Sequence, residues 1–465
     1  MSNVTHDWKS ELRRFDAGYY ELRNDDTKGV EVRIFLTPAL LESVEDSIYP
    51  QIVNAASFPG VRLVVITPDV HFGYGVPVGC VILTDANNGA VAMGPVGFDI
   101  GCGMVSARSG VPASEATQEK KHAFNREVMR RVAMGTGGRS RTLCDLDEAE
   151  FERLVRGGAE YYIERYGVAV DRSLAERDRL PVDEEWKIPW GGRGRPERGI
   201  GQIGSLGGGN HFIELQRSTH EQTLFVQVHT GSRGFGHGLA TNYFHLARAE
   251  KPDRIKHLDL GFFTPDSKHY AEYLNAVAAG GNFAIINRLA IFEQVAKAFK
   301  TVFDAELTLV YEISHNLVQR ETHPGFGDVW VHRKGATRAF PAGHPALGGT
   351  QWESTGHPVL IPGSNMDYSF ILRPREGAVK SAYSVNHGAG RRMSRTTAEK
   401  SLDRADMNRR YREAGILVNS DGKVPIDESA PCYKPSREVI DCVVDAGLAR
   451  VEHELWPLAS LKGMD

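Results

Sequence analysis

The sequence predicts an α+β fold, with a mixed β-sheet core surrounded by helices in one large domain spanning residues 1–465. Short β-branched or alternating runs, which are typical of strands, are interspersed with segments whose apolar residues recur at helical spacing. The two kinds do not follow the regular strand–helix–strand order of a parallel α/β protein. Glycine is gathered in short loops, and no linker, low-complexity tract or repeat divides the chain.

Helical spacing appears in several segments. The first helix is expected to open at Thr37 and Pro38, because proline suits the first turn of a helix. Its apolar residues follow at helical spacing, at Leu40, Leu41, Val44 and Ile48. Further helices are expected over residues 270–279, 285–303 and 437–446.

Strand patterns occur between these helices. β-Branched runs predict short strands over residues 63–67, ending at Pro68, and over residues 81–84. Residues 224–229 alternate, which places Phe225, Gln227 and His229 on one face of a strand. Residues 307–313 alternate too, and His315 continues their phase if that strand runs on.

The composition is that of an ordinary globular protein, with 41% hydrophobic and 25% charged residues and a net charge of −4. No apolar run reaches the roughly 18 residues that a membrane-spanning helix needs, and the first eight residues lack a signal-peptide pattern. We therefore expect a cytoplasmic protein with no membrane partner. Five scattered cysteines are too few for a disulfide framework. The near-neutral charge still permits a local basic groove for nucleic acid.

A glycine-rich loop places a carboxylate and a thiol three residues apart, at Asp99 and Cys102. Glycines on both sides of the cysteine leave its side chain little to pack against. A tight turn with an incidental buried thiol is one interpretation. The other is a metal site in which the thiolate and the carboxylate are ligands.

Three histidines stand at strand ends or beside glycines, at positions His211, His229 and His315. Glycines let backbone N–H groups approach a phosphate, and Arg233, shortly after His229, can grip one with two hydrogen bonds. A single histidine of this kind is more often structural. Together with the carboxylate and the thiol, the three supply enough ligands for one metal site, or for two sites that share the thiolate.

A fourth glycine-framed histidine, His387, precedes a basic segment with Arg391, Arg392 and Arg395. Taken alone, such a basic cluster is more typical of a solvated surface. Beside a histidine it suits a nucleophile that attacks a phosphate while cations absorb the charge. The residues thus indicate phosphoryl or nucleotidyl chemistry, without choosing between a hydrolase and a transferase.

Taken together, the motifs resemble the signature blocks of the RtcB-type RNA-splicing ligases, in that family's order and over nearly the whole chain. The blocks cover residues 68–71, 96–104, 207–214, 229–234, 314–316, 332–337, 362–364 and 387–391. One segment departs from the family pattern: between Pro362 and Ser369 both serines are kept, but the residues between them are bulkier. Asn386 and Cys80 are further departures.

The resemblance implies two manganese ions per subunit. Cys102 would bridge both, one ion being completed by His229 and His315 and the other by Asp99 and His211. Ligand softness alone would instead favour zinc, because thiolate and imidazole suit that metal.

The resemblance also implies GTP as a co-substrate, with His387 attacking its α-phosphorus to form a histidine–GMP intermediate. The implied nucleotide-binding residues are Asn210, His211, Phe212, Ile213, Glu214, His315, Asn316, Pro362, Gly363, Ser364, Ser369, His387, Gly388, Ala389, Gly390, Tyr433 and Lys462.

The implied reaction joins an RNA 3′-phosphate end, or a 2′,3′-cyclic phosphate after its opening, to a 5′-hydroxyl end, in RNA repair or tRNA splicing. An archease-like activator is a further expected partner. Two alternatives stand beside this interpretation. One is a metal-dependent RNA cyclic phosphodiesterase or phosphatase without ligation, and the other is a non-enzymatic RNA-binding protein.

Overall fold

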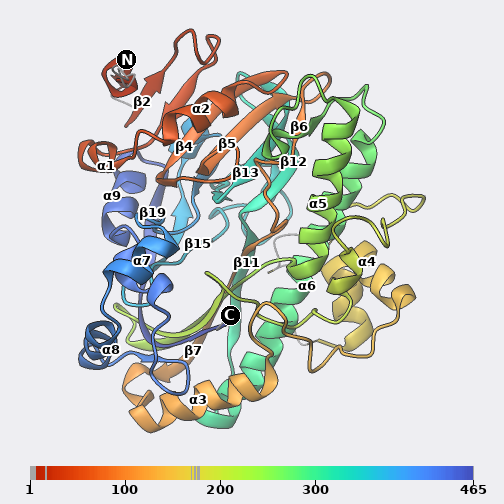
Figure 1. Ribbon diagram of the computed structural model, residues 1–465. Coiled ribbons are helices and arrows are strands. Elements are labelled where there is room, and N and C mark those ends of the chain that lie inside the picture. The colour runs from red at the N-terminus through yellow and green to blue at the C-terminus, as the bar shows by residue number, and fades with distance from the viewer. Residues whose placement is uncertain (1–6, 16–17, 169, 172–173, 175–178, 464–465) are drawn as a thin grey trace.

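The computed structural model describes residues 7–15, 18–168, 170–171, 174 and 179–463. Residues 1–6, which belong to the segment without a signal-peptide pattern, lie outside the described residues. Strands form two large sheets and two short pairs, and helices cover them (Figure 1). The predicted α+β class is confirmed.

The first sheet has seven strands in the order β1-β2-β3-β4-β5-β13-β12. Neighbouring strands are antiparallel except for β3 and β4, which are parallel. The strands are β1 (Arg13–Phe15), β2 (Tyr19–Leu22), β3 (Val32–Ile34), β4 (Val61–His71), β5 (Val78–Asp85), β12 (Asn316–His323) and β13 (Gly327–Lys334).

The second sheet has the order β11-β7-β9-β8-β19-β16-β15, and β18 pairs with β19 in parallel. Its strands are β7 (Gly103–Pro112), β8 (Phe212–Ser218), β9 (Thr223–Thr230), β11 (Thr308–Ser314), β15 (Val359–Ile361), β16 (Ser369–Pro374), β18 (Leu417–Val418) and β19 (Ala449–Lys462). The two short pairs are β6 (Val91–Ala92) with β10 (Phe262–Phe263) and β14 (Ala336–Arg338) with β17 (Ser384–Asn386).

Nine α-helices occur in the described part of the chain: α1 (Pro38–Ser43), α2 (Ile48–Ala56), α3 (Gln118–Arg131), α4 (Glu148–Tyr166), α5 (Arg233–Glu250), α6 (Tyr270–Phe303), α7 (Arg395–Ser401), α8 (Arg404–Glu413) and α9 (Ser436–Asp445). In Figure 1, α3 to α6 lie along the lower and right side, and α7 to α9 lie on the left. The long helix α6 contacts α3, α4 and α5 on one side and β7, β9 and β11 on another. Among the described helices, none combines the length and the apolar character needed to cross a membrane.

The first predicted helix is two helices. The α1 helix begins as expected, because Thr37 caps it by accepting a hydrogen bond from the backbone of Leu40 and Pro38 follows at the first turn. It ends at Ser43, because Val44 adopts an extended conformation, and Ile48 begins α2. Both Val44 and Ile48 are buried. The apolar spacing therefore arises because both residues pack into the core, and not because they belong to one helix.

Two predicted helices are instead one. The α6 helix runs without a break through Gly280 and Gly281, because tertiary packing outweighs the low helix propensity of glycine. A Cβ atom on Gly280 would lie 3.0 Å from Ile100, and one on Gly101 would lie 2.8 Å from Ala284. Glycine on both elements therefore lets the loop that carries Asp99 and Cys102 approach the helix closely.

The strand predictions hold apart from their ends. β5, β9 and α9 appear where the sequence places them. β4 does not stop at Pro68 but continues to His71, with an irregular register between Ile66 and His71. β11 ends at Ser314, and β12 begins at Asn316 in the other sheet, so His315 stands where the chain crosses from one sheet to the other.

Candidate metal centre and nucleotide cavity

Strand pairing brings the candidate metal ligands together. β11, β7, β9 and β8 are consecutive neighbours in the second sheet. The pairing places Met104 opposite His229, and His229 opposite Phe212, the residue after His211. Gly103 lies opposite Ser314, so Cys102 and His315 meet beyond that edge, where the backbone N–H of His315 donates to the carbonyl of Cys102 at 2.8 Å. Residues far apart in sequence thus converge at one end of the sheet.

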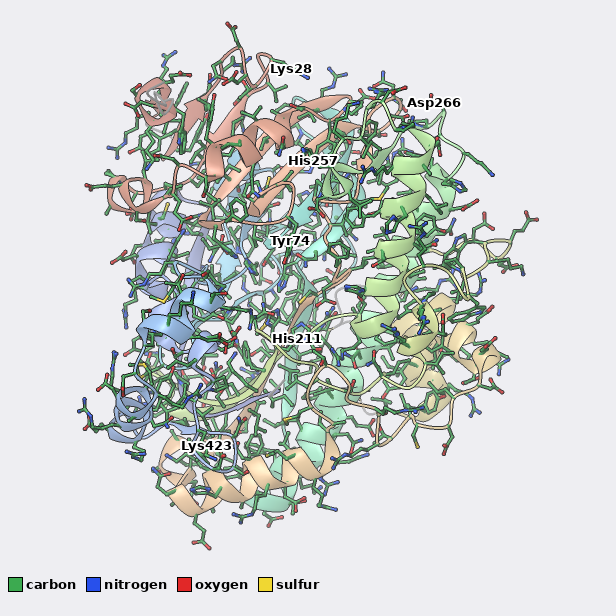
Figure 2. The ribbon with its side chains drawn as sticks, in the orientation of Figure 1. Lys28, Tyr74, His211, His257, Asp266 and Lys423 are labelled. Carbon is green, nitrogen blue, oxygen red and sulfur yellow. The ribbon has the colours of Figure 1, made fainter. Side chains whose placement is uncertain are left out.

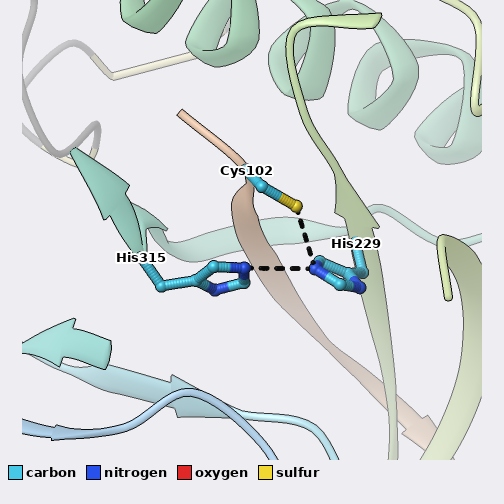
Figure 3. A group of neighbouring side chains, drawn as sticks. All are labelled: Cys102, His229 and His315. Atoms are coloured by element: carbon cyan, nitrogen blue, oxygen red, sulfur yellow. Dashed lines mark hydrogen bonds between the residues drawn. The ribbon is translucent and has the colours of Figure 1, made fainter. Parts of the chain in front are cut away.

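The converging side chains form two overlapping groups of possible ligands. Cys102, His229 and His315 make up one group, and Asp99, Cys102 and His211 the other, with the ligand atoms of each within 4.8 Å of one another. Figure 3 shows the first group, in which Cys102 Sγ lies 3.2 Å from His229 Nε2, itself 3.3 Å from His315 Nε2. In the second group, His211 Nε2 lies 3.0 Å from Asp99 Oδ2 and 3.6 Å from Cys102 Sγ.

The imidazole orientations fit a bound cation. His211 Nδ1 lies 3.0 Å from the carbonyl oxygen of Leu206, and His229 Nδ1 lies 3.2 Å from that of Asn210. A carbonyl only accepts, so each Nδ1 carries a proton and each Nε2 is directed inward, toward the other candidate ligands. Lone pairs, a carboxylate and a sulfur that face one another need either protons or metal cations between them. The donor set therefore fits two divalent cations that share the sulfur.

Burial sets the protonation states of this cluster. Burial holds the pKa of His229 and of His315 well below the usual value, so both rings are neutral and each can donate a nitrogen lone pair to a cation. Burial, with the negative charge of Asp99 beside it, raises the pKa of the Cys102 thiol. A divalent cation would displace that proton, because metal binding favours the thiolate. Burial opposes ionisation of Asp99, but hydrogen bonds and charge from His211 outweigh it and lower the pKa of this carboxyl.

A buried arginine on α6 ties the ligand-bearing segments together. Arg288 pairs with Glu312 of β11, and both side chains are fully buried. Its Nη1 donates to the carbonyls of Gly101 at 2.5 Å and Thr230 at 3.1 Å, and its Nη2 donates to Ser314 Oγ at 2.7 Å. Gly101, Thr230 and Ser314 are each the immediate sequence neighbour of a candidate ligand. Arg288 therefore fixes the relative positions of the loops that hold the cluster.

His387 lies at the edge of this cluster and is held by a buried carboxylate. Asp69 Oδ2 lies 2.6 Å from His387 Nδ1 and also accepts from the backbone N–H groups of His387 and Gly388. Burial opposes the charge on Asp69, but the charge and hydrogen bond of His387, with a further hydrogen bond from Thr67, lower the pKa of this carboxyl. The Nδ1 atom is thereby committed to Asp69. The ring of His387 lies edge-on to that of His315, with centroids 4.9 Å apart.

A cavity of about 250 Å³ opens beside His387, and it is called the nucleotide cavity here because it collects residues to which the family resemblance assigns nucleotide binding. Its lining residues are His71, Asn210, Phe212, Glu214, His229, Pro362, Gly363, Ser364, Asn365, His387, Gly388, Ala389, Gly390, Arg391, Arg395, Glu428, Tyr433 and Lys462. Most of the residues that the sequence assigns to nucleotide binding thus share one cavity. Lys462 reaches it because it is the last residue of β19 and pairs with Phe212, another lining residue, on the neighbouring strand β8.

Some predicted nucleotide residues lie elsewhere. Ile213 is fully buried and does not line the cavity, because successive side chains of β8 point to opposite faces and Phe212 and Glu214 take the cavity side. Ser369 is also fully buried, and its hydroxyl accepts from the backbone N–H of Gly363 at 3.0 Å. It supports the cavity wall from behind. His211 belongs to the cluster of candidate metal ligands, here called the donor cluster, which consists of Asp99, Cys102, His211, His229 and His315.

The bulkier segment after Ser364 does not fill the cavity. Asn365 lines it, while its side-chain oxygen accepts a hydrogen bond from the Tyr411 hydroxyl. Met366 packs against a separate apolar cluster with Tyr411, Val418 and Trp456. The extra side-chain volume is therefore largely absorbed by packing around α8.

A second cavity, of about 280 Å³, is also lined by His387. Its lining residues are His71, Tyr74, Val78, Gly94, Gly97, Phe98, Asp99, Cys102, Asn210, Phe244, Asp259, His315, Asn316, Lys334, Gly335 and His387. His71, Asn210 and His387 line both cavities. The predicted residues His315 and Asn316 face this second cavity.

Sequence reasoning assigned no role to three residues that shape the site: Arg288, described above, Asp69 and Glu428. Asp69 lies within a quoted motif, but nothing local signals its partner, which is 318 positions away. Glu428 contacts several residues of the nucleotide cavity: its carboxylate lies 3.6 Å from Lys462 Nζ, 3.2 Å from Arg391 and 2.6 Å from Arg395, and it accepts from the Tyr433 hydroxyl. An isolated acidic residue in a loop carries no pattern that predicts such a role.

Known proteins resemble this chain over nearly its whole length. The family model described as "tRNA-splicing ligase RtcB" matches residues 51–463. A protein of Mycobacterium bovis named "RNA-splicing ligase RtcB" is 35% identical, over 89% of this chain and 100% of its own length. Proteins named "tRNA-splicing ligase RtcB" from Pyrobaculum aerophilum (33% identical, 93% of this chain and 95% of theirs) and Nanoarchaeum equitans (32%, 97% and 99%) are similar too. With the matched segment holding every candidate ligand and His387, the chain belongs to the RtcB family.

Proposed function

We propose that this protein is an RNA ligase that uses GTP to join a 3′-phosphate end to a 5′-hydroxyl end. One observation carries the proposal: His387, its Nδ1 committed to Asp69, lies between a nucleotide cavity and a donor cluster suited to two cations. A simple phosphoesterase needs the donor cluster, but it does not need a nucleophilic histidine that is held by a carboxylate beside a nucleotide cavity. Membership in a family whose members are named RNA-splicing ligases supports the same conclusion.

The chain's donors suit the metals that the family resemblance implies. Cys102, His229 and His315 would hold one manganese ion, and Asp99, Cys102 and His211 the other. When bound, these ions supply charge stabilisation for phosphoryl transfer. The described residues themselves provide the orientation, since Arg288 and backbone carbonyls fix the ligands.

The nucleotide cavity offers groups that match a guanine nucleotide. Glu214 lines the cavity, and its carboxylate can accept hydrogen bonds from the N1–H and amino group of guanine. Phe212 and Tyr433 provide apolar and aromatic surface for the base and ribose. Arg391 and Arg395, whose guanidinium groups are held by Glu428, line the same cavity as His387 and can contact the phosphates of GTP.

The first step is nucleotidyl transfer to His387. Because Nδ1 donates to Asp69, the Nε2 lone pair is free to attack the α-phosphorus. A P–N bond forms, the bond between the α-phosphorus and the bridging oxygen breaks, and pyrophosphate leaves. Asp69 stabilises the positive charge that develops on the ring, as a carboxylate behind a histidine does.

The later steps build and seal the RNA end. A 3′-phosphate oxygen attacks the phosphorus of the histidine-bound GMP, so the P–N bond breaks and a phosphoanhydride forms between RNA and GMP. The 5′-hydroxyl of the other strand then attacks the RNA phosphorus and displaces GMP. A 2′,3′-cyclic phosphate enters after water opens it to the 3′-phosphate. Guanylylation is needed because a phosphate monoester is a poor electrophile without a good leaving group.

Incubation with Mn²⁺ and GTP labelled at the α-phosphate tests the proposal. We expect an acid-labile protein–GMP adduct in the wild type, none in His387→Ala, and equal metal content in both. Ligation of a 3′-phosphate RNA to a 5′-hydroxyl RNA should then require GTP, with and without an archease-like activator added. A metal-loaded wild-type protein that opens cyclic ends without forming the adduct would overturn the proposal in favour of a phosphodiesterase.

A further inference from the structure

The second cavity meets the nucleotide cavity at His387. The two have similar volumes, about 280 and 250 Å³, and both are lined by His387 and Asn210. Only the second is lined by Asp99, Cys102 and His315. A group held in the second cavity therefore lies against the donor cluster while GTP occupies the first.

Aromatic residues form one wall of the second cavity. Tyr74, labelled in Figure 2, is 70% exposed, and its ring lies edge-on to that of Phe98, with centroids 6.3 Å apart. Phe98 is itself fixed by stacking on Phe244 at 4.8 Å and on His237 at 5.3 Å. The wall thus combines a packed ring with a neighbouring ring that is open to solvent.

The exposed ring projects from a firmly held backbone. Lys334 Nζ donates to the carbonyl of Tyr74 at 2.6 Å, and Asn54 donates to that of Gly75 at 2.8 Å. Gln51 both donates to and accepts from the backbone of Gly73. An exposed aromatic side chain on such a loop contributes little to the stability of the fold, but it is pre-organised to stack with a planar ligand.

We propose that the second cavity binds the terminal nucleoside of an RNA end, with its base stacked on Tyr74 and its reacting phosphate or hydroxyl at the donor cluster. The inference rests on the proposed function. A base has a planar face that an exposed aromatic ring accepts without regard to sequence. Asp259 and Asn316, which also line the cavity, offer polar atoms to the ribose hydroxyls. Phosphates would then lie toward the cations and the base toward the aromatic wall.

Binding of short oligoribonucleotides to the Mn²⁺-loaded protein without GTP tests this inference. One set carries a 3′-phosphate and another a 5′-hydroxyl, each with either a natural or an abasic terminal residue. For the end that occupies the cavity, loss of the terminal base should weaken wild-type binding about tenfold. The same loss should have almost no effect in Tyr74→Ala, and the wild-type effect should persist in Tyr74→Phe. The two sets of oligonucleotides identify which end binds.

Phe72→Ala is the matched control, because Phe72 is 60% exposed on the same loop but does not line the cavity. It should retain the wild-type penalty for base loss. An equal penalty in wild type and Tyr74→Ala for both ends would overturn the inference. If the wild-type protein in that case still forms the GMP adduct and ligates RNA, the proposed function survives and only this inference fails. If wild type forms no adduct and binds neither set, both proposals fail.

Discussion

The carboxylate of Asp69 lies 2.6 Å from Nδ1 of His387, although the two residues are 318 positions apart in the chain. Asp69 comes from β4 in the first sheet, and His387 follows β17 in a short strand pair. Asp69 also accepts from two backbone N–H groups of the His387 loop, so the carboxylate fixes both the ring and its backbone. This contact determines which ring nitrogen is free to react.

Asp69→Asn is expected to slow formation of the protein–GMP adduct by about 100-fold or more, while metal content stays unchanged. The amide can donate to Nδ1 and so favour the tautomer whose Nε2 carries the proton and cannot attack. Single-turnover transfer from labelled GTP measures the rate. Thr67→Val, which removes only a hydrogen bond to Asp69, should have a smaller effect. A wild-type rate in Asp69→Asn would exclude the positioning role.

Cys102→Ala is expected to lose metal and all activity, because its sulfur belongs to both groups of possible ligands. Loss of a shared ligand should weaken metal affinity by at least about 100-fold. Titration with Mn²⁺ and elemental analysis measure it. Cys432→Ala, at a buried cysteine outside both groups, serves as the control and should keep its metal. Activity in Cys102→Ala would rule out the shared thiolate.

Arg288→Met is expected to lower the free energy of unfolding by about 3–5 kcal/mol, because it removes the positive charge that balances the fully buried carboxylate of Glu312. The double variant Arg288→Met/Glu312→Leu should regain much of that stability. It should not regain metal affinity, because the carbonyls of Gly101 and Thr230 remain unsupported. Denaturant unfolding and Mn²⁺ titration separate the two effects. Full metal affinity in the double variant would show that Arg288 is purely structural.

Glu214 predicts a pH dependence of GTP binding. Burial raises the pKa of its carboxyl to about 7, so it is mostly protonated at pH 6 and mostly ionised at pH 8. Only the ionised form accepts both guanine hydrogens, so GTP affinity should rise about tenfold over that interval. Glu214→Gln should remove this pH dependence. Because the ionisation of GTP itself is the same in both experiments, the ratio of the wild-type and variant GTP affinities at each pH isolates the contribution of Glu214. Parallel pH profiles would contradict the assignment.

The same raised pKa sets the sign of a stability effect. An acid whose pKa is higher in the folded state than in the unfolded chain binds a proton more tightly when folded. The contribution of Glu214 to the free energy of unfolding is therefore complete at low pH and decreases as the pH rises through the interval from about 4.5 to about 7. The comparison with Glu214→Gln should show this slope in the wild type alone.

The sequence by itself determined the α+β class and most of the strands and helices. It also determined the residue types of the site: a thiol, a carboxylate and histidines, each beside glycine or at a strand end. Each of Cys102, His229 and His315 alone is more typical of a structural residue, and they could be named as candidate ligands only because Asp99 and His211 accompany them. Local errors arose where packing overrode propensity, as at Gly280 within α6 and at Val44 after α1.

Only the tertiary structure decided how those residues meet. Strand register and sheet order decide that Asp69 contacts His387. They also decide that Phe212 and Glu214 line the nucleotide cavity while Ile213 does not, and that the chain crosses between the sheets at His315. Register is set by contacts between segments hundreds of residues apart, and a shift of one residue would turn each side chain to the other face. No local pattern of residues contains that information.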